Sequence, residues 1–347
     1  MPQGAKPGHW MEKSRVLVVI VNYRAANESL GAVAGALAAL DGLSGGITVV
    51  DAASGNDSAR SISAEIAARG QERRVRVLEA GSAVGLAASN NIGICAGLPE
   101  GQVPDYIYLL NARARPTPDT IRRLIAHLDA RPRTGIVGTS LFGPDGARLP
   151  SAFRFPSIRG EFEGAARLGA LSRLLPGTSQ RMAAPETTRA VDWVCGSSMM
   201  LRRGALDEIG LFDEDYRVFY DDADLCRRAR AAGWGTDYLF ESRVDLHVPP
   251  HDSDSIRQRV PQRWMDARLR YFIKNHGRFH AAAATVAHVA GGLVRRLVLA
   301  GPRIDPPRFL RNLILHDLGA ALRSIWASLR SIMSADPARA PRRARRR

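Results

Sequence analysis

Short apolar segments of strand length alternate with helix-forming segments between residues 15 and 138. Each apolar segment is hydrophobic at successive positions, so neither face of such a strand would be left to water. Strands of this kind, separated by helices, form parallel sheets whose two faces are both covered. The sequence therefore predicts an α/β fold with a mostly parallel central sheet. The expected strands cover residues 15–23, 47–51, 75–80, 106–111 and 135–138.

Polar residues stand where several of these strands end. Tyr23 closes the first strand, Asp51 the second and Asn111 the fourth. Ligands of open α/β sheets bind outside the carboxyl ends of the strands, so these are candidate binding residues. A dinucleotide-binding enzyme would have glycines in the first turn, where the backbone must approach a pyrophosphate. The turn reads VNYRAANES, with no glycine, which argues against a hydride-transfer enzyme.

Three carboxylates stand in and just before the first turn of a predicted helix, ADLCRRARAAG. They are Asp221, Asp222 and Asp224. The helix dipole alone favours an acid at this position, so simple capping is the alternative interpretation. However, three acids preceded by the aromatic pair Phe219 and Tyr220 exceed what a cap requires. Adjacent carboxylates also repel each other, which raises a pKa toward the range useful to a general base.

The formal net charge of +15 predicts an anionic partner, such as a phosphorylated ligand or an acidic membrane surface. Part of the excess lies in the tail 338–347, which we expect to be disordered. Aromatic residues make up only 6% of the chain, whereas nucleic-acid binders interleave aromatic with basic residues. Nucleic acid is therefore not the expected partner.

The cysteines and the apolar segments bear on the expected compartment. Cys95, Cys195 and Cys226 are odd in number and widely spaced, which fits neither a zinc site nor a disulfide framework and favours a reducing cytosol. The N-terminal segment is too polar for a signal peptide. The apolar stretch 281–301 contains two arginines and a histidine, so we do not expect it to span a membrane.

Eight motifs in order resemble the inverting family 2 glycosyltransferases, which have a GT-A fold, and especially their bacterial rhamnosyltransferase-like members. The resemblance covers about residues 15–253, and FDEDYRVFYDDADLCRRARAAGW is its most specific part. That part belongs to the motif WVCGSSMMLRRGALDEIGLFDEDYRVFYDDADLCRRARAAGW, and the seven others are VVIVNY, ITVVDAASGNDS, VGLAASNNIGI, DYIYLLNARARPTPD, GIVGTSLFGPDG, RFPS and VDLHVPPHDS.

The resemblance implies that the strand ends and one glycine bind a nucleotide-diphosphate sugar. Asp51 suits this role, since a carboxylate accepts hydrogen bonds from a base imide or a ribose hydroxyl. Gly85 would let the backbone close over the donor. The implied donor-binding residues are Val21, Tyr23, Asp51, Gly85, Asn111 and Arg113.

On the acceptor side, the resemblance makes Asp222 the general base. It would remove the proton from an acceptor hydroxyl as that oxygen attacks the anomeric carbon, which inverts its configuration. Asp221 would orient the acceptor or the base. Trp193 and Gly196 would line the acceptor site, although plain core packing is the alternative for Trp193. His247 would help to hold a metal–diphosphate group.

The chain departs from the family pattern on the donor side. The family's metal-binding acid after the fourth strand is replaced by Arg113, and two expected asparagines are Ala52 and Ala83. This makes a divalent Mg or Mn cofactor doubtful. Either Arg113 pairs with the diphosphate in place of the metal, or the donor site has decayed and the protein is a catalytically silent binding or regulatory partner. The complete segment around Asp222 favours an active enzyme.

Beyond the catalytic region the sequence predicts basic, apolar helices. Such helices lie in the interface of anionic membranes, although packing onto the catalytic domain is the alternative. The predicted enzyme is a hexosyl- or deoxyhexosyl-transferase for cell-surface polysaccharide synthesis, peripheral on the cytoplasmic face of the inner membrane, with a saccharide or polyprenyl-linked acceptor. The expected organisation is a flexible 1–14, a catalytic domain 15–253 (donor half 15–115, acceptor half 116–253), helices within 254–335 and a disordered basic tail 336–347.

Overall fold

The computed structural model describes residues 14–82, 84–166, 182, 184–247, 261–298 and 308–333. Most of the predicted N-terminal segment 1–14 and all of the predicted tail 336–347 therefore lie outside the described residues. Four parallel strands form the first half of the central sheet, in the order β3-β2-β1-β4. These strands are β1 (Arg15–Asn22), β2 (Ser44–Asp51), β3 (Val75–Glu79) and β4 (Tyr106–Asn111).

The second half of the sheet is mixed. β11 (Ser198–Arg202) runs antiparallel to β4 and to β6 (Thr134–Phe142), and β12 (Gly235–Leu246) runs parallel to β6. Short strands complete it: β5 (Ala114–Pro116), β7 (Arg148–Leu149) and β9 (Arg189–Ala190). β8 (Ala152–Phe153) and β10 (Trp193–Val194) form a separate pair. The predicted mostly parallel sheet is present, with antiparallel β11 joining its two parallel parts.

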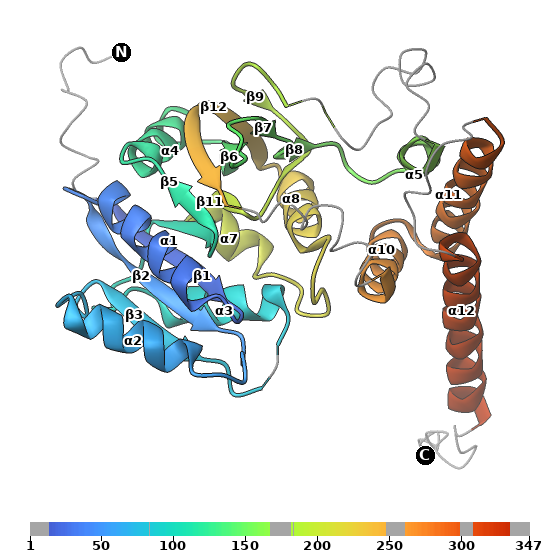
Figure 1. Ribbon diagram of the computed structural model, residues 1–347. Coiled ribbons are helices and arrows are strands. Elements are labelled where there is room, and N and C mark those ends of the chain that lie inside the picture. The colour runs from blue at the N-terminus through green and yellow to red at the C-terminus, as the bar shows by residue number, and fades with distance from the viewer. Residues whose placement is uncertain are drawn as a thin grey trace, which may run out of the picture.

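Helices cover both faces of the sheet, as the apolar strands require (Figure 1). The side chains of β1 alternate between the two cores: Val18 and Ile20 face one, and Leu17 and Val19 face the other. The first core is covered by α1 (Ala26–Ala39), α2 (Ser58–Ala68) and α4 (Thr120–Ala130). The second is covered by α3 (Leu86–Ala96), α7 (Arg203–Ile209) and α8 (Asp221–Ala231).

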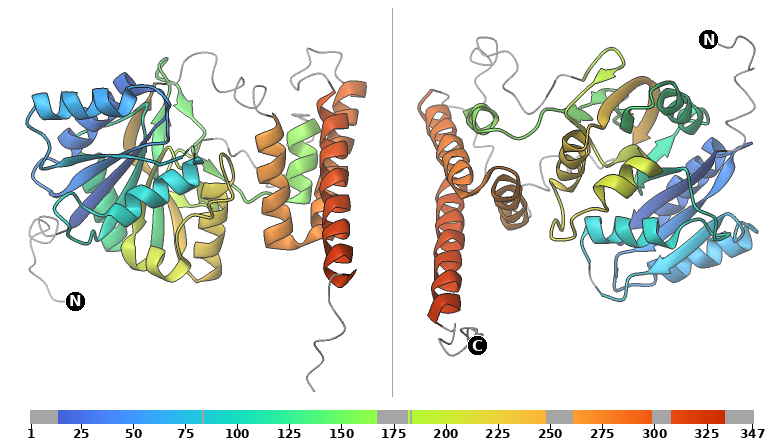
Figure 2. Two further views of the ribbon diagram at one scale, coloured as in Figure 1. Left: turned by 90° about the horizontal axis from the view of Figure 1, so that it is seen from below. Right: turned by 180° about the vertical axis from the view of Figure 1, so that it is seen from behind.

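A layer of helices lies on one side of the sheet domain, at the end opposite β3 and α2 (Figure 2). It comprises α5 (Ile158–Ala166), α10 (Pro261–His276), α11 (Arg278–Val298) and α12 (Phe309–Met333). At Gly291 the backbone of α11 meets that of α5: a Cβ added there would lie 2.2 Å from the Phe162 carbonyl oxygen. Among the described helices, none is long and apolar enough to cross a membrane.

A buried ion pair joins the helices of this layer. Arg268 on α10 is fully buried, and its Nε donates to Oε2 of Glu161 on α5 at 2.8 Å. Nδ1 of His288 on α11 lies 2.8 Å from the same oxygen, and Arg268 also contacts Asp317 on α12. Burial alone would raise the pKa of Glu161, but Arg268 and His288 lower it to about 2. Removing one member would leave a buried charge unpaired, so the pair fixes the packing of the layer.

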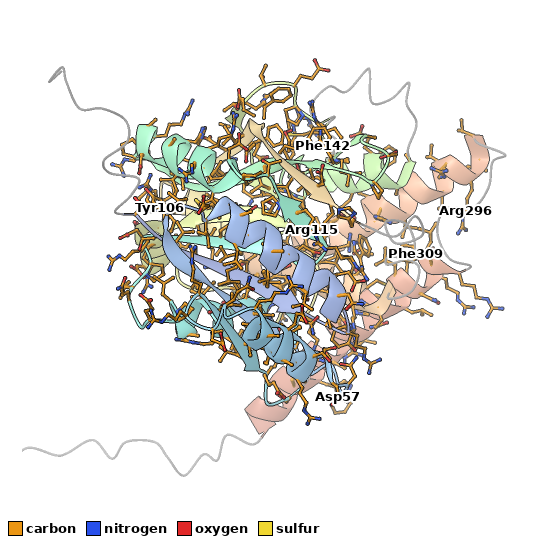
Figure 3. All side chains as sticks on the ribbon, turned by 60° about the vertical axis from the view of Figure 1, so that its left-hand side comes forward. Asp57, Tyr106, Arg115, Phe142, Arg296 and Phe309 are labelled. Carbon is orange, nitrogen blue, oxygen red and sulfur yellow. The ribbon has the colours of Figure 1, made fainter. Side chains whose placement is uncertain are left out.

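The layer also has an aromatic centre. Phe309, labelled in Figure 3, begins α12 and is 1% exposed. Its ring packs against Trp264 and His288, with centroid distances of 5.8 and 6.0 Å. The helices predicted for residues 254–335 therefore form a packed unit with α5, which precedes them by about a hundred residues in the chain.

Candidate active site

A cavity of about 180 Å³ lies where β1, β4 and the start of α8 meet. It brings together residues that are far apart in the sequence, because neighbouring parallel strands end at the same edge of the sheet. Val21 pairs in register with Asn111, whose N–H donates to the Ser197 carbonyl at 2.9 Å. The polar lining residues are Asn90, Asn111, Cys195, Ser197, Asp221 and Asp222. The predicted residues Val21, Asn111, Gly196, Asp221 and Asp222 thus share one cavity.

The turn before α8 positions the carboxylates of Asp221 and Asp222, which line this cavity. Phe219 and Tyr220 both adopt left-handed backbone conformations, with φ of 73° and 63°. Such conformations cost non-glycine residues about 1–3 kcal/mol each and persist only where packing enforces them. The Tyr220 ring packs against Tyr271 and Trp264 of α10, with centroid distances of 5.5 and 6.5 Å. The helical layer therefore contributes to the geometry of the turn that precedes Asp221 and Asp222.

Asp222 is held in a fixed orientation. Its Oδ2 accepts a hydrogen bond from the Gly196 N–H at 3.1 Å, and its Oδ1 accepts one from the Ala223 N–H at 2.9 Å. Burial raises the pKa of Asp222, and these two hydrogen bonds limit that rise. Burial raises the pKa of the neighbouring Asp221 as well, and repulsion from Asp222 raises it further. The two carboxyls therefore titrate as a coupled pair, at higher pH than ordinary carboxyl groups.

The third acid of the cluster has another role. Asp224 is fully buried, and its Oδ2 accepts from Lys274 and from Arg228, each at 2.9 Å. Lys274 also donates to Asp213 at 2.7 Å, and Arg270 contacts the same carboxylate at 2.8 Å. α10 therefore forms ion pairs with both ends of the segment 213–224. Sequence reasoning missed Lys274 and Arg270, because a basic helix does not reveal which acids it will meet.

Gly85 allows the same segment to close onto α3. The Leu86 N–H donates to the Arg217 carbonyl at 2.8 Å. A Cβ added at Gly85 would lie 2.5 Å from the Arg217 Cα, so a larger residue would push the segment away. Gly85 therefore makes a close backbone contact beside the cavity, and its role in donor binding stays a prediction.

The Asp51 carboxylate accepts hydrogen bonds from neighbouring residues of the protein. It is 4% exposed and accepts from Asn22 Nδ2 at 2.5 Å, from Ser54 N–H at 2.8 Å and from Ser54 Oγ at 2.6 Å. It does not line the cavity, although it ends the strand next to Val21. Tyr23 is 59% exposed, with the Arg24 guanidinium 5.5 Å from its ring centroid. Donor binding by Asp51 and Tyr23 stays a prediction.

Arg113 and His247 lie side by side although 134 positions separate them in the sequence. The His247 N–H donates to the Arg113 carbonyl at 2.8 Å, where β12 pairs with β5. The Arg113 N–H donates in turn to Asn111 Oδ1 at 2.9 Å. Asn111, which lines the cavity, is thus linked to Arg113, and Arg113 to His247, by hydrogen bonds of the backbone N–H groups.

Trp193 does not line the cavity. Its ring stacks on Phe153 with a centroid distance of 4.2 Å, and its Nε1 donates to the Arg154 carbonyl at 2.8 Å. The predicted acceptor contact of Trp193 stays a prediction. Of the altered positions, Ala52 is buried and Ala83 lies outside the described residues.

Metal binding by His247 stays a prediction. Within the ranges that the structure describes, no three or more His, Cys, Asp or Glu side chains are grouped so as to hold a metal ion. The backbone contact of His247 is with Arg113.

The chain matches the family described as "Glycosyltransferase like family 2" over residues 14–267. The chain belongs to this family. The match includes all the residues that line the cavity, and it ends at residue 267, within α10. The family resemblance inferred from the motifs is confirmed.

Two bacterial relatives of this glycosyltransferase family 2 protein are rhamnosyltransferases. Over 190 residues it is 33% identical to the N-acetylglucosaminyl-diphospho-decaprenol L-rhamnosyltransferase of Mycobacterium tuberculosis, covering 52% of this chain and 60% of that protein. Over 199 residues it is 26% identical to the rhamnosyltransferase WbbL of Escherichia coli K12, covering 56% of this chain and 72% of that protein. The matched region is thus less than two thirds of the mycobacterial protein.

A solved glycosyltransferase has the same fold. The mannosyltransferase PcManGT from Pyrobaculum calidifontis, in complex with GDP-Man and Mn²⁺, is 17% identical and superimposes with a TM-score of 0.50. The likeness covers 91% of this chain and 80% of that protein. It confirms the predicted GT-A fold.

The raised carboxyl pKa values predict that the contribution of Asp221 and Asp222 to stability falls as the pH rises. The folded state binds protons on these residues more tightly than the unfolded chain does, so their contribution is lost progressively between the ordinary carboxyl pKa and the raised values. Asp221→Asn cannot ionise. We expect it to unfold at a higher temperature than wild type in mildly alkaline buffer, with a gain on the order of 2 kcal/mol.

Thermal unfolding of both proteins from mildly acidic to mildly alkaline pH measures this effect. Asp41→Asn, a change at an exposed acid, is the control and should follow the wild-type curve. Parallel wild-type and Asp221→Asn curves would contradict the assignment of a buried, raised-pKa pair.

Proposed function

We propose that this protein is an inverting glycosyltransferase that transfers a deoxyhexose from a nucleotide-diphosphate donor to a saccharide carried on a polyprenyl lipid. The family supports glycosyl transfer. The names of the two relatives support rhamnose as the sugar, and the mycobacterial name supports a lipid-diphosphate acceptor. The product would enter the synthesis of a cell-surface polysaccharide.

The observation that carries the proposal is the orientation of Asp222 at the cavity wall. Two backbone N–H groups hold its carboxylate, and its raised pKa makes it a stronger base than an exposed aspartate. In the proposed step, Asp222 takes the proton of an acceptor hydroxyl while that oxygen bonds to the anomeric carbon. The bond from that carbon to the diphosphate breaks on the opposite side, and the nucleoside diphosphate leaves with the electron pair. The anomeric configuration is inverted.

Asp221 supports this base. Burial raises the pKa of both carboxyls, and their mutual repulsion separates their two ionisation steps, so one of them keeps its proton when the other is ionised. A protonated carboxyl can donate a hydrogen bond to the acceptor and adds no second negative charge beside the base. A catalytically silent homologue would have no need for such a pair. The intact pair and the enzyme names of both relatives therefore favour an active transferase over a silent partner.

Asp222→Asn should lower kcat by about 10²–10⁴-fold, because an amide cannot accept the acceptor proton. Asp221→Asn resembles the protonated form of Asp221 and should cause a much smaller loss. In wild type, kcat should fall as the pH drops through the raised pKa of Asp222. Transfer from dTDP-rhamnose, UDP-sugars and GDP-sugars to a polyprenyl-diphosphate saccharide measures the kcat of both variants and the pH dependence of the wild type. Equal losses in the two variants would argue against Asp222 as the base.

We further propose that Arg113 stabilises the departing diphosphate. A guanidinium pairs with two phosphate oxygens at once, and the backbone contacts to Asn111 and His247 hold this turn at the cavity edge. The structure of PcManGT contains Mn²⁺. In this chain the corresponding charge compensation would come from arginine, and transfer would not depend on a divalent ion.

Arg113→Ala should lower kcat by about 10²-fold or more, the usual cost of one lost donor to a developing anion. Arg113→Lys should retain part of the activity, because lysine supplies the charge without the two-point geometry. Wild-type turnover should survive EDTA. The control is Arg243→Ala, an exposed arginine on β12 paired with Asp245. Loss of wild-type turnover in EDTA and its restoration by Mg²⁺ or Mn²⁺ would overturn this proposal.

The site of action would be the cytoplasmic face of the inner membrane. α11 and α12 expose large apolar side chains, including Phe279 at 96% and Trp326 at 64%, and both helices carry arginines. Such surfaces bind anionic bilayers by apolar burial and by electrostatic attraction.

The full-length protein should therefore co-sediment with phosphatidylglycerol vesicles and not with phosphatidylcholine vesicles, and added salt should weaken the binding. Arg296→Glu combined with Arg311→Glu should reduce it by more than about tenfold, since each cation near an anionic surface contributes about 1 kcal/mol. Arg60→Glu, on exposed α2 at the far end of the molecule, is the control. Equal binding of both vesicle types would contradict electrostatic docking.

A further inference from the structure

The helical layer contains a second, larger cavity. It is a groove of about 570 Å³ between α10, α11 and α12, and almost all of its lining is apolar. Representative lining residues are Leu269 and Ile273 from α10, Val286 and Val289 from α11, and Ile314 and Leu318 from α12. The groove extends along α11 from Arg278 to Leu293, which is about 22 Å of helix. Its length and chemistry fit one extended hydrocarbon chain.

The groove opens onto an apolar surface. Val286 is 69% exposed and Leu318 is 56% exposed, and both line the groove. Leu322 and Trp326 continue the same exposed apolar character along α12. Soluble monomers rarely expose contiguous apolar patches of this kind unless they bind something.

α10 separates this groove from the catalytic cavity. Leu269 and Ile273 line the groove, whereas Tyr271 and Lys274 of the same helix contact the turn and the helix that carry Asp222. A helix with its side chains is about 10 Å across. A molecule with its chain in the groove could therefore extend past α10 and present its head group to the catalytic cavity.

We propose that this groove binds the isoprenoid chain of the lipid-linked acceptor, an inference that rests on the proposed function. The charges around the groove support this occupant, since the lining carboxylate Asp317 is already paired with Arg268. Arg278 lines one end of the groove, and Arg295 and Arg296 follow its other end along α11 (Arg296 is labelled in Figure 3). Cations at the mouth of an apolar groove suit a chain that carries a phosphate or diphosphate.

Two other occupants fit less well. The chain's own C-terminal segment, residues 334–347, reads SADPARAPRRARRR, which offers no large apolar side chain and would add positive charge to a basic rim. A second copy of this protein would bring the same arginines and the same net charge of +15 against that rim. An anionic lipid satisfies both the apolar lining and the charge.

The test uses full-length protein and geranylgeranyl monophosphate, an isoprenoid phosphate without a sugar, in isothermal titration calorimetry. Two matched pairs of variants probe the groove. Leu318→Gln changes a lining residue and Leu322→Gln changes its neighbour one turn along, which is 59% exposed and does not line the groove. Ala290→Phe fills the groove, and Ala283→Phe places the same side chain on an exposed part of α11 outside it.

We expect saturable binding to wild type and to both controls. Leu318→Gln should weaken it at least fivefold and Ala290→Phe at least tenfold, while hydrolysis of the nucleotide-sugar donor stays unchanged in all four variants. With a full acceptor, the groove variants should raise KM and leave kcat nearly unchanged. Leu318→Gln also guards against misfolding, since its side chain is largely exposed.

Equal affinity of each groove variant and its control would overturn the inference, as would the absence of saturable binding to wild type. So would a wild-type dimer in light scattering that Leu318→Gln dissociates, since a second copy would then occupy the groove. These results are independent of the donor reaction. Failure of the proposed function would instead appear as no donor hydrolysis or transfer in wild type.

Discussion

Lys274 of α10 forms ion pairs with both ends of the segment 213–224, because its ammonium contacts both Asp213 and the buried Asp224. Tyr220, in its left-handed conformation, packs against the same helix. Without α10, Asp224 would be a buried carboxylate with one cation fewer, and the strained turn would lose the packing that maintains it. The positions of Asp221 and Asp222 therefore depend on a helix that follows β12 in the chain.

This dependence explains how binding and chemistry are arranged around one element. One side of α10 orients the acid pair, and the other side lines the apolar groove. The buried pair of Arg268 and Glu161 joins α10 to α5, and His288 joins α11 to the same carboxylate, so the helical layer is one packed unit. In the proposed arrangement, a lipid-linked acceptor would contact both sides of α10.

The sequence anticipated the elements well and their partners poorly. The alternation of apolar strands and helices was sufficient for the parallel half of the sheet, since that pattern depends on local periodicity. The antiparallel direction of β11 did not follow from that pattern, because strand direction is set by neighbours such as β4. Asp51 was predicted from its place at a strand end and Trp193 from the family resemblance, and in the structure their side chains contact Ser54 and Phe153.

The sequence by itself determined the α/β class, the family and the acid pair at the start of α8, since each is encoded in a contiguous stretch of residues. Only the tertiary structure decided which of three adjacent acids face the cavity, that Arg113 lies beside His247, and that an apolar groove lies behind α10. The physical reason is that pKa shifts, cavities and ion pairs depend on distances between segments far apart in the chain. Those distances exist only after the strands and helices have packed.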